Sequence, residues 1–185
     1  MRVEPKMRHP MRKIEFLAIA ALLLTLAIGN AAAVDSEQTR KTLAGLQGVY
    51  VIVEELQPNI QKYASKFDLD KASLQKTAES RLRDAGIRTL NGDEWLKTPG
   101  RPVLYINVNT HEQEKYWFAY NIEVELQQVA AMEANPAIKS LVGTWSVNMA
   151  GMVNIGTINV LQDRVKNLVD IFIKAYLAAN PKKNP

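Results

Sequence analysis

The chain has 185 residues, and its composition and charge exclude several classes of protein. It contains no cysteine, which excludes disulfides, cysteine-ligated zinc and thiol nucleophiles. The formal net charge of +4 is concentrated at the start, because residues 1–33 hold five basic and two acidic side chains and residues 34–185 hold 18 and 17. A chain so nearly neutral lacks the basic field on which nucleic-acid binding depends, and we expect no nucleic-acid partner.

The N-terminus has the three parts of a secretory signal peptide. A basic segment runs to Lys13, an apolar run of 13 residues covers 16–28, and small residues at 31–33 form an A-x-A cleavage site. This run is shorter than the roughly 20 residues that a membrane-spanning helix needs. We therefore expect residues 1–33 to be removed, leaving Val34 first in a periplasmic or secreted protein without a stable membrane span. An uncleaved membrane anchor is the alternative.

The remaining chain has the length of one domain. Residues 34–44 are mostly polar, and we expect them to form a flexible, extended lead-in. The predicted domain covers residues 45–181, and residues 182–185 form a short polar tail.

The first half of this domain predicts a buried strand followed by two helices. Residues 49–54 are apolar on both faces and rich in β-branched side chains, which is typical of a strand buried on both sides. Pro58 opens a short helical segment with one apolar face. Residues 70–85 give the clearest helix, because Asp70 is a natural N-cap and Gly86 favours the left-handed conformation that ends a helix.

The pattern then changes to β-structure. Residues 87–90 predict a short strand, and residues 93–100 predict a loop. Residues 103–108 are rich in β-formers, and residues 116–126 alternate apolar and polar side chains, which indicates a long strand with one face in solvent. We expect these two runs to pair as an antiparallel hairpin across a loop that contains His111.

The end of the chain predicts one more strand and one long helix. Residues 133–139 interrupt the strand pattern, and residues 141–149 resume it. Between residues 158 and 179 apolar side chains recur at helical spacing until Asn180-Pro181 ends the helix. The elements together predict an α+β fold with a single mixed, largely antiparallel sheet of four to six strands, helices packed on one face and a long C-terminal helix.

None of the common catalytic or cofactor motifs is complete. Glycine-rich phosphate-binding loops are absent. His111-Glu112 begins like a zinc-protease helix, but position 115 is lysine, and no second histidine follows. Ser73 and Lys76 match the S-x-x-K motif of penicillin-recognising enzymes without its supporting elements, and Ser73 is better explained as a first-turn helix residue. We therefore assign no catalytic, cofactor-binding or metal-binding residue.

Five side chains are candidates for a binding surface. Glu123 and Glu125 point the same way from one predicted strand, which allows them to share a site. Trp117 stands on the same polar face beside Tyr116, and Trp95 lies in the predicted loop; tryptophan and tyrosine are frequent at binding hot spots. The alternatives are a solvated sheet face that keeps the protein soluble and a helix that covers the Trp117 ring.

Several segments carry a resemblance to a known group: Gly48 to Glu54, Leu82 to Ile87, Pro102 to Val108, Gly143-Thr144-Trp145, Val169-Asp170 and Asn180-Pro181-Lys182. They resemble a group of small exported bacterial proteins of unknown function over nearly all of the predicted mature chain. The order of elements is also similar to periplasmic α/β domains of the TolB N-terminal and LpoB kind. This resemblance implies a protein-binding module of the cell envelope and supplies no catalytic residue.

We therefore expect an exported, non-catalytic domain that binds an envelope protein or glycan, without a cofactor. A carboxylate-dependent hydrolase acting on glycan or peptide is one alternative, and it needs two acids converging in a pocket with a raised pKa. A carrier of a small apolar ligand is another, and it needs a cavity between sheet and helix.

Overall fold

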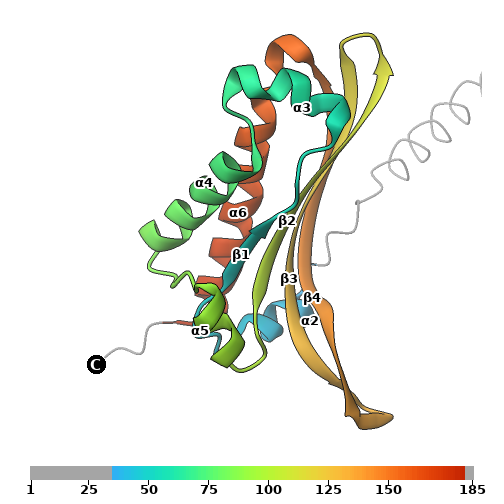
Figure 1. Ribbon diagram of the computed structural model, residues 1–185. Helices are drawn as coiled ribbons and strands as arrows, with labels where there is room; N and C mark the ends of the chain where they lie inside the picture. The colour runs from blue at the N-terminus through green and yellow to red at the C-terminus, as the bar shows by residue number, and fades with distance from the viewer. Residues whose placement is uncertain (1–34, 182–185) are drawn as a thin grey trace, which may run out of the picture. The chain divides into compact units, whose positions relative to one another are not determined.

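The computed structural model describes residues 35–181, so the predicted signal peptide, its cleavage site and residues 182–185 lie outside the described range. The described chain forms two layers, a four-stranded sheet and a set of helices against one of its faces (Figure 1). This arrangement confirms the predicted α+β fold with a mixed sheet and a long C-terminal helix.

The strands lie in the sheet in the same order as in the chain. They are β1 (Tyr50–Val53), β2 (Val103–Glu114), β3 (Trp117–Met132) and β4 (Asn135–Asn154). β1 pairs with β2 in parallel, whereas β2, β3 and β4 form an antiparallel meander. Because side chains alternate across a pleated strand, each strand gives one set of residues to the helix layer and the other set to the opposite face.

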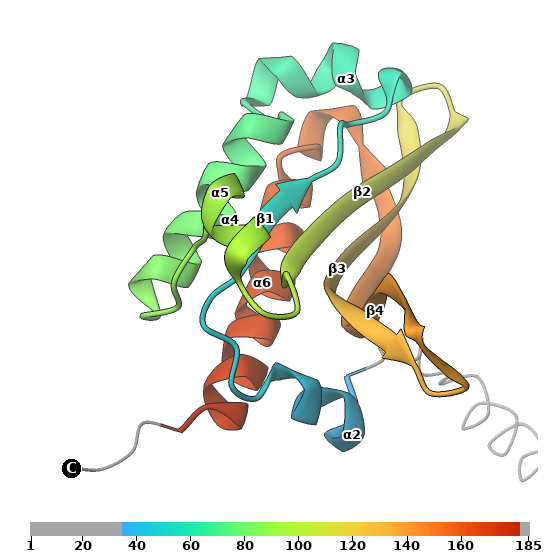
Figure 2. The same ribbon diagram turned by 60° about the horizontal axis from the view of Figure 1, so that its bottom comes forward.

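The helices are α2 (Glu37–Arg40), α3 (Pro58–Ala64), α4 (Lys71–Asp84), α5 (Gly92–Lys97) and α6 (Val160–Ala179), with 3-10 turns at Lys41–Leu43, Ser65–Phe67 and Ile155–Thr157. α4 packs against β1, and α6 packs against β3, β4 and α4 (Figure 2). Arg81 of α4 donates from Nε to Asp170 of α6 at 2.7 Å. Among residues 35–181, none of the helices combines the length and the apolar character needed to cross a membrane.

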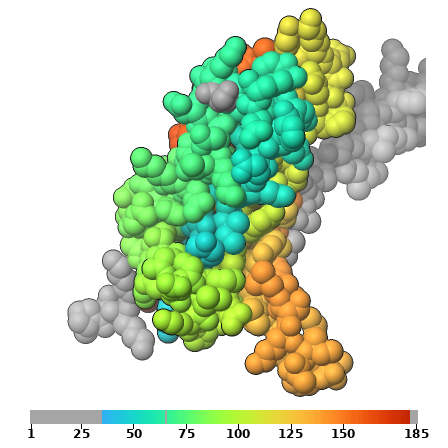
Figure 3. All heavy atoms as spheres, viewed as in Figure 1, coloured from blue at the N-terminus to red at the C-terminus, as the bar shows by residue number. Residues whose placement is uncertain are grey.

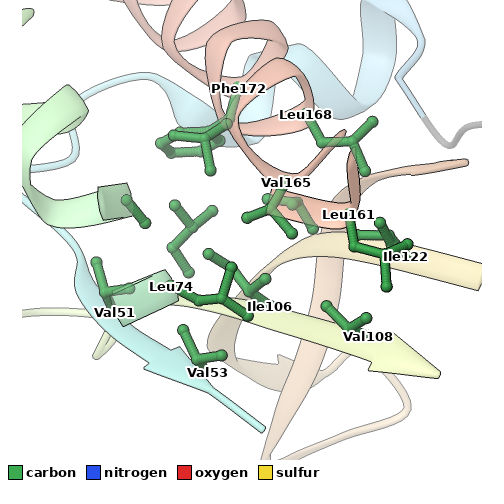
Figure 4. Packing of buried hydrophobic residues seen from close by; sticks show 14 of the residues in the cluster. Val51, Val53, Leu74, Ile106, Val108, Ile122, Leu161, Val165, Leu168 and Phe172 are labelled. Atoms are coloured by element: carbon green, nitrogen blue, oxygen red, sulfur yellow. The ribbon is translucent and has the colours of Figure 1, made fainter. Parts of the chain in front are cut away.

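One apolar core fills the space between the two layers (Figure 4). α6 supplies a stripe of buried residues that includes Leu161, Val165 and Phe172. The Phe172 ring meets Trp145 of β4 edge-on, with 5.3 Å between the ring centroids. Both rings are almost completely removed from water, and this contact therefore fixes α6 to the β4 side of the sheet.

The caps of α4 confirm the prediction for this helix. The Asp70 side chain accepts a hydrogen bond from Ser73 N at 2.7 Å, and Ser73 Oγ accepts one from Asp70 N at 3.1 Å. Gly86 adopts a φ of 77°, in the left-handed region. Ser73 is thus part of a capping box, which explains the S-x-x-K match structurally.

The predicted loop around His111 is wrong, because His111 lies within β2. β2 continues to Glu114, and the hairpin turns at Lys115 and Tyr116, where Tyr116 has a φ of 74°. The polar end of β2 is held in the sheet by its pairing with β3, in which His111 lies opposite Ala119. A prediction from polar composition alone therefore assigns a loop to a segment that is a solvent-exposed strand.

The predicted interruption at residues 133–139 is also wrong. A two-residue turn at Glu133 and Ala134 joins β3 directly to β4, which begins at Asn135 and extends five residues past the predicted end. Pro136 is tolerated because it lies near the start of an edge strand, where its missing N–H breaks no ladder bond.

Residues 93–100 do not form the predicted loop, because α5 occupies most of this segment. Asn91 caps the helix by accepting from Glu94 N, and the Glu94 side chain accepts from Asn91 N, each at 2.9 Å. This reciprocal capping box nucleates a helix in a segment whose glycine and proline favour a loop.

Two further segments differ from their predictions. Residues 87–90 contribute an isolated bridge at Thr89 instead of a strand. Residues 37–43 are helical instead of extended, because Ser36 caps α2 and Leu43 is fully buried in the core. The segment that was expected to be a lead-in is thus part of the packed domain.

Candidate binding surface on the open sheet face

The face of the sheet opposite α4 and α6 is the candidate site, and we call it the open face. It is formed by alternate residues of the strands: Ile52, Glu54, Tyr105, Asn107, Asn109, His111, Trp117, Ala119, Asn121, Glu123, Glu125, Ser146, Asn148, Ala150 and Met152. The set contains three carboxylates and several amides, and it contains no lysine or arginine. Its charge is therefore negative.

The three carboxylates gather around Tyr105. The Tyr105 hydroxyl donates a hydrogen bond to Oε2 of Glu54, which follows β1. Tyr105 also lies directly opposite Glu125 in the β2–β3 ladder, and Glu123 follows on the same face. Among residues 35–181, none of the three carboxylates takes part in an ion pair. Their negative charges are therefore available to a partner.

The protonation of these groups reflects this negative field. The hydrogen bond to Glu54, burial and the charges of Glu125 and Glu123 together raise the pKa of Tyr105 to about 12. Burial, and then the charge of Glu125, raise the pKa of Glu123 above its ordinary value. Burial disfavours any charge at these groups, whereas the repulsion from the neighbouring carboxylates, a lesser cause of both shifts, favours a bound cation.

Gly143 makes room for the Glu125 side chain. A β-carbon at position 143 would lie 1.8 Å from Oε1 of Glu125. The other carboxylate oxygen, Oε2, accepts a hydrogen bond from Gln127 Nε2 at 2.7 Å. A register shift between β3 and β4 at this point sets Gly143 opposite Gln127. The glycine and the bulge therefore hold the carboxylate of Glu125 against β4.

Trp117 and Met152 form the apolar end of the open face. Their exposed fractions are 46% and 55%, and Tyr116 in the adjoining turn is also exposed. A cleft of about 360 Å³ lies between these two side chains and the end of β2 at Gln113 and Glu114. The Trp117 ring is therefore exposed, and no helix of the described residues covers it.

Trp95 does not belong to this cluster. Its ring packs against Tyr50, with 5.7 Å between the centroids, so α5 covers the opposite end of the sheet. Tyr50 pairs with Val103, and Trp117 pairs with Glu114 at the other end of β2. At about 3.3 Å per residue, the two ends are about 35 Å apart. The structure thus brings Trp117, Glu123 and Glu125 to one face, with Tyr116 in the turn next to Trp117, and separates Trp95 from them.

Sequence reasoning missed Glu54 and Tyr105. The sequence pattern predicts Glu54 only as the end of a strand, because the pairing of β1 with β2 depends on contacts 50 residues away along the chain. One signal was available: Tyr105 and Asn107 alternate with buried Leu104 and Ile106, which indicates that β2 also has a solvated face.

The arrangement offers hydrogen-bond acceptors, negative charge and one exposed aromatic side chain. Within the described residues, no three histidine or acidic side chains lie close enough to hold a metal ion. Comparison of the chain with protein-family models and with curated proteins finds no match.

Proposed function

We propose that this chain is an exported, non-catalytic domain that binds a protein or another component of the cell envelope through the open face. The observation that carries the proposal is the group of three carboxylates around Tyr105, with which no lysine or arginine of residues 35–181 forms an ion pair, on the same sheet face as the exposed Trp117. The export signal predicted from residues 1–33 and the resemblance to envelope-binding domains support the location.

The electrostatics of the open face favour a basic partner. Burial raises the pKa of Glu123 most, and the charge of Glu125 raises it further, so the two carboxylates repel each other. A partner that brings lysine or arginine side chains relieves this repulsion and gains charge-assisted hydrogen bonds. Because the carboxylates lie at or near the surface, added salt should screen this attraction.

The Trp117 end supplies the apolar part of such an interface. Binding hot spots are enriched in tryptophan and tyrosine, whose rings bury a large area at a low entropic cost. Trp117 sits beside Met152 on one side of a cleft, so a partner side chain can contact both. Acidic residues would then orient the partner, and the ring would hold it.

A crosslinking pull-down from envelope extract tests the proposal. We expect the wild-type protein to recover a partner, and we expect Trp117→Ala and the double variant Glu123→Gln, Glu125→Gln each to reduce recovery at least tenfold. Recovery by the wild type should also fall as the salt concentration rises.

Phe67→Ala is the matched control, because Phe67 is an aromatic residue of similar exposure that lies outside the sheet, in the 3-10 turn after α3. It should leave recovery unchanged. If all variants recover the same proteins as the wild type, the open face is not the binding surface.

The raised pKa of Glu123 favours one second candidate, a hydrolase of glycan or peptide in which Glu123 is the acid and Glu125 the base. Its test is product release from purified envelope glycan and from peptides, measured by mass spectrometry over a range of pH. Product release by the wild type that is lost in Glu123→Gln would support the hydrolase. No product release by the wild type at any pH would exclude hydrolysis of these substrates. The filled core gives no comparable support to an apolar-ligand carrier.

A further inference from the structure

β4 forms one edge of the sheet over 20 residues. Its inner side pairs with β3 along its whole length. Among residues 35–181, no main-chain group of any other element bonds to the main chain of β4. A long edge of this kind presents a row of N–H and C=O groups on which another strand can pair.

By contrast, the opposite edge of the sheet, formed by β1 and the end of β2, is protected. β1 has four residues, and β2 runs on beyond it. At that point Gln57 Oε1 accepts from Thr110 N at 2.7 Å, and Asn59 Nδ2 donates to Thr110 O at 2.9 Å. Side chains at the start of α3 thus occupy the free edge of β2. On β4, Thr42 Oγ1 donates to Thr144 O at 3.4 Å and Thr157 Oγ1 to Asn154 O at 3.2 Å. Among the described residues, no side chain bonds to the main chain of residues 145–153.

The first part of β4 carries the usual protection of an edge strand, namely Pro136, Lys139 and the bulge at Gly143, whereas the second part lacks it. From Ser140 to Asn154 β4 contains no charged residue and no proline, whereas natural edges commonly carry lysine or proline to prevent pairing. In a two-fold antiparallel pair, residues near the axis face the same residues of the other copy, so a charged side chain there would repel its equivalent. An uncharged strand is therefore suited to pairing with a second copy of itself.

Two exposed apolar clusters lie toward opposite ends of β4. Beyond the start of β2 at Val103, the β3–β4 hairpin projects from the body as an arm (residues 128–142; Figures 1 and 3). The arm exposes Met132, Ile138 and Leu141, by 39%, 53% and 46%. At the other end, Trp117 and Met152 are exposed on the open face. Met152 thus lies within the uncharged part of β4, whereas most of the arm lies outside it.

We propose that β4 pairs with β4 of a second copy, antiparallel and around a two-fold axis perpendicular to the sheet. With the axis near Ala150, residues 146–154 of the two copies pair, and the two arms extend beyond the paired stretch. It also keeps both open faces on the same side of one continuous sheet. The observations on the β4 edge carry this proposal independently of the proposed function.

The absence of cysteine makes single-cysteine variants direct reporters of this pairing, because any disulfide formed must join two copies. Facing residues in an antiparallel pair have Cα atoms about 4.5–5.5 Å apart, within the range that a disulfide spans. We would express the 185-residue chain with Asn148→Cys, Ala150→Cys or Met152→Cys and oxidise the recovered protein mildly. Crosslinking should peak at one position and fall severalfold at its neighbours.

Lys76→Cys, on the exposed surface of α4, is the control and should give only background dimer. Equal crosslinking at β4 and at Lys76 would overturn the proposal.

Ala150→Lys supplies the second test, measured by analytical ultracentrifugation. Ala150 is exposed, so the folded monomer should tolerate lysine, but the new charges would oppose each other near the axis. We expect the dimer dissociation constant to rise at least tenfold, whereas His111→Lys, on inner strand β2 of the same face, should leave it unchanged. A wild-type protein that stays monomeric at all concentrations would overturn the proposal, even if its β4 pairs with a strand of another protein. A dimer whose dissociation constant Ala150→Lys does not change would also overturn it.

Discussion

Tyr105 links the charge of the open face to the stability of the fold. Its hydroxyl comes from β2, and the carboxylate that accepts its hydrogen bond comes from Glu54 at the end of β1. The bond joins two segments about 50 residues apart, and the negative charges of Glu123 and Glu125 act on the same phenol. The ionisation of one side chain therefore reports on the whole cluster.

The stability of the protein should depend on the ionisation of Tyr105. Its pKa is about 12 in the folded state and about 10 in an unfolded chain. Folding therefore favours the neutral phenol, and this stabilisation is fully present below pH 10 and lost as the pH rises from about 10 to about 12. In urea unfolding at a series of pH values, the wild type should lose more free energy of unfolding over this range than Tyr105→Phe.

Tyr116→Phe serves as the control for this measurement, because it removes a phenol from the exposed turn and leaves the Glu54 cluster intact. It should follow the wild-type pH dependence. Identical slopes for the wild type and Tyr105→Phe would contradict the account of the cluster.

Gln57 and Asn59 protect the edge of β2, so their removal should cost stability. Truncation of either side chain leaves a main-chain group of the largely buried Thr110 without its partner. We expect Gln57→Ala and Asn59→Ala each to lower the free energy of unfolding by about 1–3 kcal/mol, measured by urea denaturation. Gln61→Ala, on the exposed side of α3, should change it by less than about 0.5 kcal/mol. Equal effects at all three positions would contradict this role.

At the scale of elements, local signals decided which predictions succeeded. α4 and α6 could be predicted because the Asp70 cap, the Gly86 end and the apolar stripe of α6 are encoded within each segment. α5 was also encoded locally, in the Asn91 and Glu94 capping box, but the glycine and proline nearby favoured a loop.

The extent of β2 and β4 could not be predicted from local pattern. Residues 110–114 and 135–140 are largely polar or exposed, and their strand conformation depends on ladders to β3. The same limit applies to the site. Glu123 and Glu125 share a face by simple alternation, whereas the approach of Glu54 to Tyr105 requires the register between β1 and β2.

The bulge in β4 allows a test of Glu125 that leaves its carboxylate in the protein. Gly143→Ala places a methyl group where Oε1 of Glu125 lies, so the flexible side chain must move away. We expect envelope-partner recovery to fall severalfold while the free energy of unfolding changes by less than about 1 kcal/mol, because an ordinary surface substitution has a small effect. Gly92→Ala, which meets open space, should not change recovery. Unchanged recovery by Gly143→Ala would show that the position of Glu125 is unimportant.

At the scale of the whole molecule, one side of the sheet is used for the core and the other side is exposed. The helices and one face of the sheet form the core, which leaves the open face and the β4 edge available for contacts with other molecules. Pairing through β4 would extend the open face across two copies without covering it. A dimer would thereby present two carboxylate clusters on one surface, and a partner with repeated basic segments would bind it with higher avidity.

Site-specific photocrosslinking in living cells tests the central claim, that the open face is the surface at which an envelope partner binds. A photoreactive residue replaces Asn121, in the middle of the open face, or Lys76, on the exposed side of α4. The account predicts an adduct from position 121 in the envelope fraction that position 76 does not form and that Glu123→Gln with Glu125→Gln weakens. Adducts from position 76 alone, or the same adducts from both positions, would contradict it.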